Sequence, residues 1–243
     1  MKRIVWISLI VFSARLFAQI TIPPGTILPV ALNSSVNSRK AKVGEVITAR
    51  VMQDVPLPHR TIPVGSKVIG HITTVKSADA TSGAQVSFRF DTLVTRKQRI
   101  PIITNLRALA SMMAVEEAQL PETGPDRGTS ANAWTTDQIG GEVVYRGGNL
   151  VANGLMPVGK STSTGVLVHL SAKPGSECRG DIEGKDRLQA AWVFSSDACG
   201  VYDTPNLEIA HAGRTNPVGE IDLVSDKGDV NVRAGSGMLL RVD

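Results

Sequence analysis

Short apolar runs rich in β-branched residues, separated by Gly and Pro, fill the first half of the chain after residue 20. This pattern is typical of strands and turns. Residues 86–91 show it most clearly, because Val86, Phe88 and Phe90 alternate with polar residues and so give a strand one apolar and one polar face. The other runs that predict strands in this half are 27–32, 46–52, 68–75 and 100–103.

The pattern changes between Leu106 and Leu120, where Ala, Leu, Met and Glu replace the β-branched residues. These residues favour a helix. Met112, Met113 and Val115 are expected to form its core-facing side. Pro, Gly, Asp, Ser and Thr then accumulate in residues 121–136, a composition typical of a linker.

Strands are expected again in the second half, at 142–145, 166–170 and 188–194. Near the C-terminus Ile221 and Leu223 alternate with charged residues, and a turn follows at 225–228. The alternation continues in 230–232 and 238–242. This spacing predicts a meander of neighbouring strands.

The fold predicted from these patterns is mainly β, with short antiparallel strands in barrel or sandwich units and one helix near 106–120. A chain of this length can bury its core as one large or two small domains. The predicted division is a signal peptide at 1–18, a β-barrel-like domain at 20–103, a helix and polar linker at 104–139, and a β-rich domain with a disulfide at 140–243.

The first eighteen residues have the order of a signal peptide, with basic Lys2 and Arg3 followed by an apolar run at 4–12. The run is too short to cross a bilayer as a helix, and Arg15 follows it. We expect cleavage after Ala18 and export to the periplasm or beyond. No later segment is apolar enough to predict a membrane span after cleavage.

Charge gives little support for a nucleic-acid partner, and none is predicted. The whole chain has a formal net charge of +4, but the predicted mature part has 23 basic and 22 acidic residues. It also lacks a cluster of Lys and Arg interleaved with aromatic residues. Aromatic residues are only 4% of the chain, which argues against an outer-membrane barrel with its aromatic girdles.

The chain has two cysteines, Cys178 and Cys199. In an exported chain such a pair predicts a disulfide. The alternative, a metal or redox pair, needs nearby His ligands or a Cys-x-x-Cys arrangement, and neither is present.

Three short motifs match known signals in letters but not in context. Residues 154–161 fit the phosphate-loop pattern, yet residues 162–168 favour a strand where that loop requires a helix. We therefore expect a Gly-rich turn and no cofactor. Residues 120–124 match a sortase signal without the apolar span and basic tail that follow it, and 179–181 match an adhesion tripeptide.

Residues typical of catalysis or metal binding are scattered along the chain. The sequence contains no Gly-x-Ser-x-Gly elbow and no His-Glu-x-x-His helix. A polar loop at 181–186 carries three acidic residues without the spacing of a calcium loop. No catalytic, cofactor-binding or metal-binding residue is assigned. The histidines are His59, His71, His169 and His211.

Four stretches of the first half carry a family resemblance: 25–32 (Gly-Thr-Ile-Leu-Pro-Val-Ala-Leu), 36–38 (Val-Asn-Ser), 49–51 with 54–55, and 62–70 (Ile-Pro-Val-Gly-Ser-Lys-Val-Ile-Gly). With them, residues 25–103 resemble the β-barrel region of the TrbI-like scaffold proteins, which line conjugation and type IV secretion channels in the periplasm. The resemblance implies a barrel and a scaffold role, and it assigns no functional residue. The second half resembles uncharacterised secreted bacterial proteins.

Two glycines in the stretch 62–70 have an expected structural role. Gly65 should allow a tight corner after Pro63 fixes the chain, and Gly70 should allow close approach of a neighbouring backbone.

The leading hypothesis is an exported, non-enzymatic binding or scaffold protein that contacts an envelope protein or a cell-wall component through strand edges and loops. One alternative is an exported hydrolase whose site is built from distant residues, such as His169 or His211 with the polar stretch 126–137. Another is a small-ligand-binding β-barrel, which needs a deep apolar cavity.

Overall fold

The structure is a computed structural model that describes residues 21–79, 82–96, 98–120, 135–141, 143–145, 150–153, 155–171, 178 and 187–243. The predicted signal peptide lies outside these residues. The described residues form a mainly β fold with one short helix, as the sequence predicted. The strands are β1 (Ile27–Leu32), β2 (Val36–Asn37), β3 (Val46–Val51), β4 (Val55–Leu57), β5 (Arg60–Ile62), β6 (Lys67–Lys76), β7 (Ala84–Val94), β8 (Arg99–Pro101), β9 (Thr104–Ala110), β10 (Thr135–Asp137), β11 (Val143–Tyr145), β12 (Val151–Asn153), β13 (Met156–Thr162), β14 (Gly165–Val168), β15 (Gln189–Ala190), β16 (Gly200–Tyr202), β17 (Leu207–His211), β18 (Ile221–Ser225), β19 (Asn231–Val232) and β20 (Gly237–Val242).

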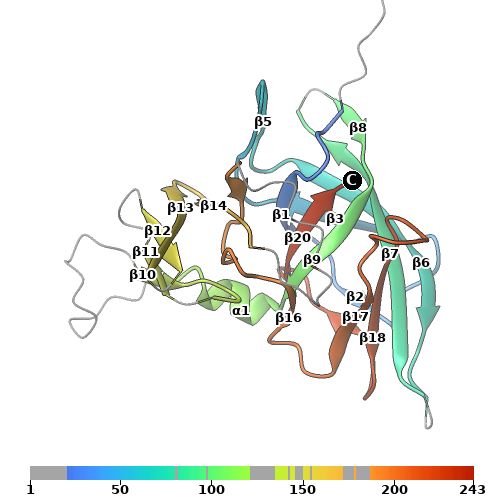
Figure 1. The fold of residues 1–243 in the computed structure, drawn as a ribbon. Helices are drawn as coiled ribbons and strands as arrows, with labels where there is room; N and C mark the ends of the chain where they lie inside the picture. The colour runs from blue at the N-terminus through green and yellow to red at the C-terminus, as the bar shows by residue number, and fades with distance from the viewer. Residues whose placement is uncertain are drawn as a thin grey trace, which may run out of the picture.

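One large sheet curls until it almost closes into a barrel (Figure 1). Its strand order is β16-β9-β20-β1-β3-β6-β7-β18-β17, and β8 pairs with β7 beside this path. The first and last strands of the order, β16 and β17, are consecutive in the chain, so residues 203–206 connect the two edges of the sheet. Neighbouring strands are antiparallel except β16 and β9, which run parallel.

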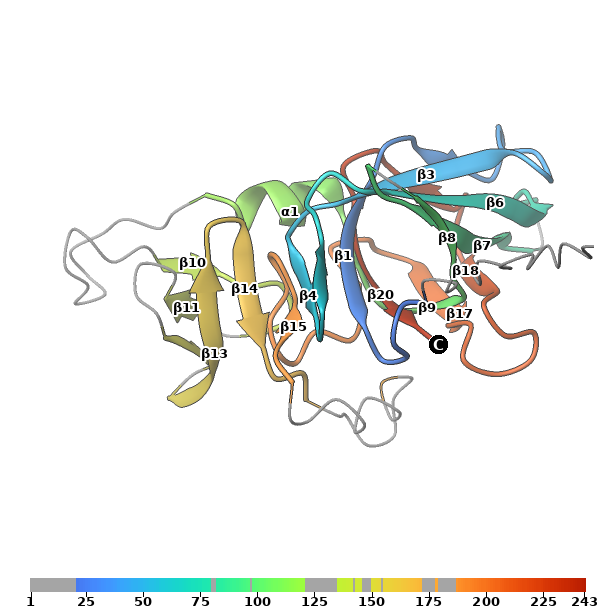
Figure 2. The same cartoon turned by 90° about the horizontal axis from the view of Figure 1, so that it is seen from above.

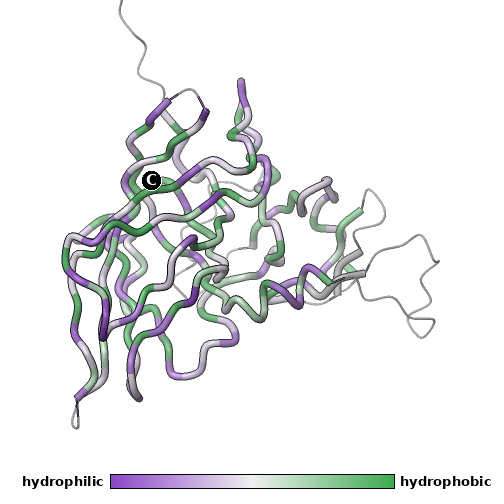
Figure 3. The backbone as a smooth tube through the Cα atoms, turned by 180° about the vertical axis from the view of Figure 1, so that it is seen from behind, coloured by the Kyte–Doolittle hydropathy of each residue, from purple (hydrophilic) through white to green (hydrophobic). Residues whose placement is uncertain are grey.

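The inside of the barrel is filled by apolar side chains. On β3, for example, Ile47, Ala49 and Val51 point inward and are buried, and the residues between them are more exposed. Figure 3 shows hydrophobic and hydrophilic residues following one another along the strands of the barrel. The rings of Phe88 and Phe90 meet edge to face with centroids 5.7 Å apart.

A second core lies outside the barrel, between β1, β9 and β20 on one side and α1 (Met112–Glu117) with the small sheet β12-β13-β14-β15 on the other (Figure 2). Because the barrel core lies on one side of β1 and β9 and the second core lies on the other, every residue of these two strands is buried. Ile27 and Ala108 face this second core, where they pack among Val115, Trp192 and Phe194.

Gln53 is a buried polar link between the barrel and the small sheet. Its side-chain N–H group donates to the Val166 carbonyl at 2.9 Å, and its carbonyl oxygen accepts from the Trp192 N–H at 2.7 Å. Gln53 therefore forms hydrogen bonds with two backbone groups on the side of the small sheet, and the Val166 carbonyl also accepts from the Ala191 N–H at 3.0 Å.

Gln53→Leu is expected to lower the free energy of unfolding by about 2 kcal/mol, because it removes two buried hydrogen bonds that contribute about 1 kcal/mol each. Urea denaturation would measure the change. Gln119→Leu is the matched control, since Gln119 is exposed and its side chain donates to the Val115 carbonyl just after α1. Equal losses in the two variants would contradict a linking role for Gln53.

The two glycines take the roles that the sequence predicted. Gly65 has a φ of +83°, and the Ser66 N–H donates to the Pro63 carbonyl to close the corner. At Gly70, a Cβ atom would lie only 2.0 Å from the Arg89 carbonyl oxygen on the neighbouring strand.

The predicted helix at 106–120 is shorter in the structure. Residues 104–110 form β9, and α1 begins only after Ser111, whose hydroxyl accepts from the Ala114 N–H at 3.0 Å. The prediction is wrong for this first part because β9 lies between β20 and β16, and hydrogen bonds to both neighbours outweigh helix propensity. Val115 packs in the core as expected, but Met113 is 57% exposed.

The predicted division between 20–103 and 140–243 does not separate two sheets. Strands β16, β17, β18 and β20 from the second half complete the sheet that the first half begins. The predicted meander is also wrong in its pairing, since β18 pairs with β7 and β17, β19 with β2, and β20 with β1 and β9. Alternation predicts a strand but does not identify its partner.

Candidate functional site

Cys178 and Cys199 form a disulfide, as predicted, with their Cα atoms 6.2 Å apart. Cys199 precedes β16, and the Tyr202 hydroxyl accepts from its N–H and donates to its carbonyl. Cys178 is completely buried.

Arg107 of β9 fixes the segment before Cys199 to the barrel. Its Nε donates to the Ala198 carbonyl at 2.8 Å, and its Nη2 donates to the Ser171 carbonyl at 2.7 Å. Burial lowers the pKa of Arg107 to about 10, so the side chain stays charged at neutral pH. Sequence reasoning missed this residue, although a lone Arg within the apolar run 106–110 was a signal for it.

The phosphate-loop match lies in a β-hairpin. β13 and β14 pair antiparallel, with Lys160 opposite Leu167, so a strand stands where a phosphate loop would need a helix. Lys160 is exposed. The acidic loop at 181–186, the adhesion tripeptide and residues 121–124 of the sortase match lie outside the described residues.

The histidines occupy separate places. His59 and His169 are exposed, His169 directly after β14 of the small sheet. His211 ends β17 of the barrel, where its Nδ1 lies 2.6 Å from the Glu220 carbonyl oxygen and its Nε2 lies 3.0 Å from the Thr215 hydroxyl. The hydrolase alternative expected His169 or His211 beside the stretch 126–137, most of which lies outside the described residues.

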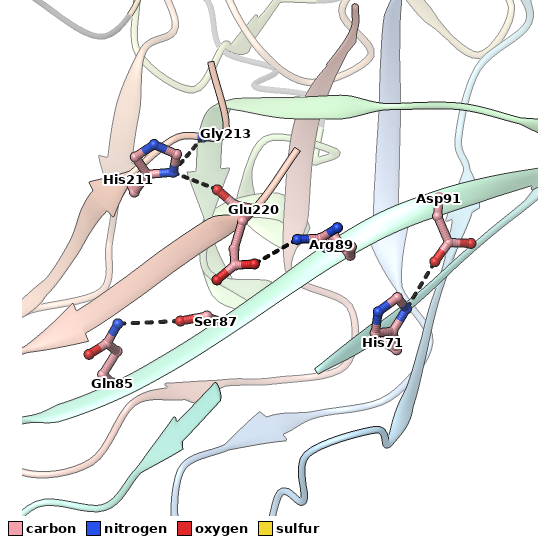
Figure 4. A network of polar contacts seen from close by, with 8 residues as sticks. All are labelled: His71, Gln85, Ser87, Arg89, Asp91, His211, Gly213 and Glu220. Atoms are coloured by element: carbon pink, nitrogen blue, oxygen red, sulfur yellow. Dashed lines mark hydrogen bonds and ion pairs between the residues drawn. The ribbon is translucent and has the colours of Figure 1, made fainter. Parts of the chain in front are cut away.

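Two polar contacts lie on the outer face of β6, β7 and the start of β18 (Figure 4). His71 Nδ1 lies 2.9 Å from Asp91 Oδ2, and Arg89 Nη2 donates to Glu220 Oε2 at 2.7 Å. The groups are part-exposed, so each contact contributes little to stability. Within the described residues no group of three or more His, Cys, Asp or Glu could hold a metal ion.

Two adjoining hollows of about 420 and 570 Å³ lie at the end of the barrel that carries β2, β19 and the start of α1. Met112, Asn231 and Arg233 line both, so the hollows form one continuous depression, here called the α1 groove. Its remaining walls come from the turn after β2, with Lys40, and from the loop between β18 and β19, with Lys227. Segments distant in sequence thus meet at one surface.

Ser111 and Asp203 fix α1 against the loop between β16 and β17. The Ser111 hydroxyl donates to Asp203 Oδ2 at 2.5 Å while it accepts from the Ala114 N–H at the start of the helix. The Ser111 N–H also donates to the Tyr202 carbonyl at 3.1 Å. These contacts hold one wall of the α1 groove in place before any partner binds.

The acidic residues of the α1 groove already have partners. Asp229 forms an ion pair with Arg39 and accepts from the Ser38 hydroxyl at 3.0 Å. Asp203 accepts from Ser111, and Glu45 Oε2 accepts from the Lys42 N–H at 3.0 Å.

The basic residues of the α1 groove differ in this respect. Lys40, Lys227 and Arg233 are exposed, and their side chains have no hydrogen-bond or ion-pair partner among the described residues. Met113 lines the same hollow as Lys227 and Arg233 and is 57% exposed. The surface therefore combines unpaired positive charge with an apolar, adaptable side chain.

Such an arrangement can bind an extended, acidic segment of another molecule. Charge would orient the segment, and the pre-formed wall at Ser111 and Asp203 would limit the ordering cost. The local sequence signal for this surface was Met112 with Met113, which the sequence pattern assigned to the core. The meeting of residues 40, 227 and 233 depends on the sheet.

No helix among the described residues is long and apolar enough to cross a membrane. The TrbI-like resemblance stays a prediction. Comparisons with protein-family models, with curated proteins and with solved structures find no match to this chain.

Proposed function

We propose that the protein is an exported, non-enzymatic binding module of the bacterial cell envelope, and that the α1 groove holds an acidic segment of an envelope protein. The observation that carries this proposal is the set of three unpaired cations in a depression whose own carboxylates are occupied. Long-range attraction would speed the encounter, and the apolar contact with Met113 would slow release.

The packing of the barrel favours binding at the α1 groove over binding of a small ligand inside the barrel. Phe88, Phe90 and Leu106 are fully buried inside the barrel among other apolar side chains. A small ligand would have to displace them, at a cost similar to that of disrupting a core. The α1 groove requires no such displacement.

A photocrosslinking amino acid at Met113 is expected to capture a protein partner in producing cells, because that side chain is exposed at the rim. Lys227→Glu with Arg233→Glu should reduce the yield by about tenfold, since two attractive charges become repulsive. Mass spectrometry of the adduct would identify the partner and the acidic segment.

Two controls give the experiment its specificity. Leu155 is 100% exposed on the small sheet, so a crosslinker there samples a surface away from the groove. Lys76→Glu with Lys160→Glu makes the same change in net charge at exposed lysines elsewhere. The proposal fails if position 155 captures the same partner equally, or if the two double variants lose equal yield.

A further inference from the structure

A row of basic side chains crosses the outer face of the barrel at the end opposite the α1 groove. Arg50 of β3 lies directly opposite Lys67 of β6, Lys67 lies opposite Val94 of β7, and Val94 lies opposite Arg99 of β8. Residues directly opposite in antiparallel strands point to the same face of the sheet. Arg50, Lys67 and Arg99 are all exposed, while their strand neighbours Val51, Val68 and Ile100 are buried.

The row is unfavourable for the isolated protein. Like charges directly opposite each other on paired strands destabilise a sheet, and Arg50 and Lys67 occupy such positions. None of the three basic side chains has a hydrogen-bond or ion-pair partner in the described part of the chain. A bound anion would relieve the repulsion that the sheet otherwise retains.

Two further arginines extend the row. Arg60 and Arg96 border a hollow of about 430 Å³ between β5 and the β7–β8 turn, with Ile62, Pro63 and Ile100 among its lining. Arg60 Nη2 donates to the Thr21 carbonyl at 2.7 Å, and Arg96 is exposed. Arg50, Arg60, Lys67, Arg96 and Arg99 are here called the basic face.

Carboxylates at this end of the barrel are engaged elsewhere. Asp54 Oδ1 accepts from the Val64 N–H at 2.7 Å, and Asp243 forms an ion pair with Arg241 at 2.8 Å. Apolar side chains are exposed at the same end, Val64 at 44% and Ile103 at 52%. The basic face thus combines cations that have no carboxylate partner among the described residues with apolar neighbours.

We propose that the basic face docks the protein on a membrane surface of anionic phospholipid. Rows of cations separated by strand spacings of roughly 5 and 10 Å can contact several headgroups at once, and guanidinium groups bind phosphate in a bidentate manner. The exposed apolar side chains suit the boundary between headgroups and acyl chains. The face contains no aromatic side chain on which nucleic-acid bases could stack.

The place where the chain enters the barrel agrees with this orientation. Thr21, the first described residue, contacts Arg60 of the basic face. The apolar run at 4–12, which the sequence predicts to engage the membrane during export, precedes Thr21 in the chain. Export would therefore deliver this end of the barrel close to the membrane, and the α1 groove at the other end would face away from it.

Co-sedimentation with vesicles tests the proposal, using the exported protein purified from the periplasm. Binding is expected to vesicles that mix phosphatidylglycerol with phosphatidylcholine, and to weaken as salt is raised. Each cation near an anionic surface contributes roughly a factor of five in affinity. Arg50→Gln, Lys67→Gln and Arg99→Gln together should therefore weaken binding about 100-fold.

The matched control replaces Lys42, Lys76 and Lys160 by Gln, which changes the net charge equally at exposed lysines outside the basic face. It should bind as the wild type does. Equal losses in both triple variants, equal binding to pure phosphatidylcholine, or displacement by millimolar inorganic phosphate would overturn the proposal. None of these outcomes bears on capture of a partner by the α1 groove.

A second readout separates binding from a structural role. Arg50→Glu replaces the repulsion with Lys67 by an attractive pair, so the melting temperature should rise by about 1–2 °C while vesicle affinity falls. If Arg50 only stabilised the fold, the melting temperature of Arg50→Glu would fall and its vesicle binding would not change.

Discussion

Gly70→Ala is expected to lower the free energy of unfolding by about 3 kcal/mol or more. A Cβ at this position would lie 2.0 Å from the Arg89 carbonyl oxygen and 2.9 Å from the Phe90 Cα. Both atoms belong to the backbone of β7, so the clash cannot be relieved by rotating a side chain. Strands β6 and β7 would have to separate where the register between them already shifts, next to Ile69.

Gly44→Ala is the control for this substitution. Gly44 has a φ of +83°, and a Cβ there would meet nothing within 4 Å. Alanine at that position should cost about 1 kcal/mol, from backbone strain alone. Urea denaturation of the two variants distinguishes steric overlap with β7, at position 70, from backbone strain, at position 44. Equal losses of unfolding free energy in the two variants would contradict the close approach of β6 and β7.

Loss of the disulfide between Cys178 and Cys199 is expected to lower the free energy of unfolding by about 3 kcal/mol in the chain-entropy model. For a protein of this size that change corresponds to a fall of roughly 6–12 °C in melting temperature. The bond closes a loop with a sequence separation of 21 residues, and it anchors that loop next to the segment that Arg107 holds.

Cys178→Ser with Cys199→Ser should melt at the same temperature as wild-type protein treated with reductant, and the barrel should keep its circular dichroism below the transition. The barrel has its own apolar core, to which neither cysteine belongs. Two free thiols in non-reducing peptide maps of the exported protein, or an unchanged melting temperature in the double variant, would contradict a stabilising bond.

Several elements of the fold follow from local sequence alone. Strands β1, β3 and β7 lie where the apolar pattern predicts them. In β3 and β7 burial of one side favours alternation at period two, and β1 is a continuous apolar run because both of its sides are buried. Gly65 and Gly70 were identified from their neighbours, since a corner and a close backbone contact both require a residue without a side chain. The disulfide followed from a single pair of cysteines in a chain with a predicted signal peptide.

Other elements were decided only by the tertiary structure. The run 104–110 has helix-forming residues but is a strand, because β20 and β16 offer it hydrogen bonds on both sides. The last three strands are consecutive in the chain but pair with strands from the first half, since a strand finds its partner by long-range packing.

Both proposed surfaces have the same origin. The alignment of Arg50, Lys67 and Arg99 results from cross-strand register, and the meeting of Lys40, Lys227 and Arg233 results from the near closure of the barrel. Neither set shows a pattern along the chain, because side chains from distant segments become neighbours only when the strands pair. The sequence by itself determined which segments are strands and turns, and the tertiary structure alone determined which charges lie together.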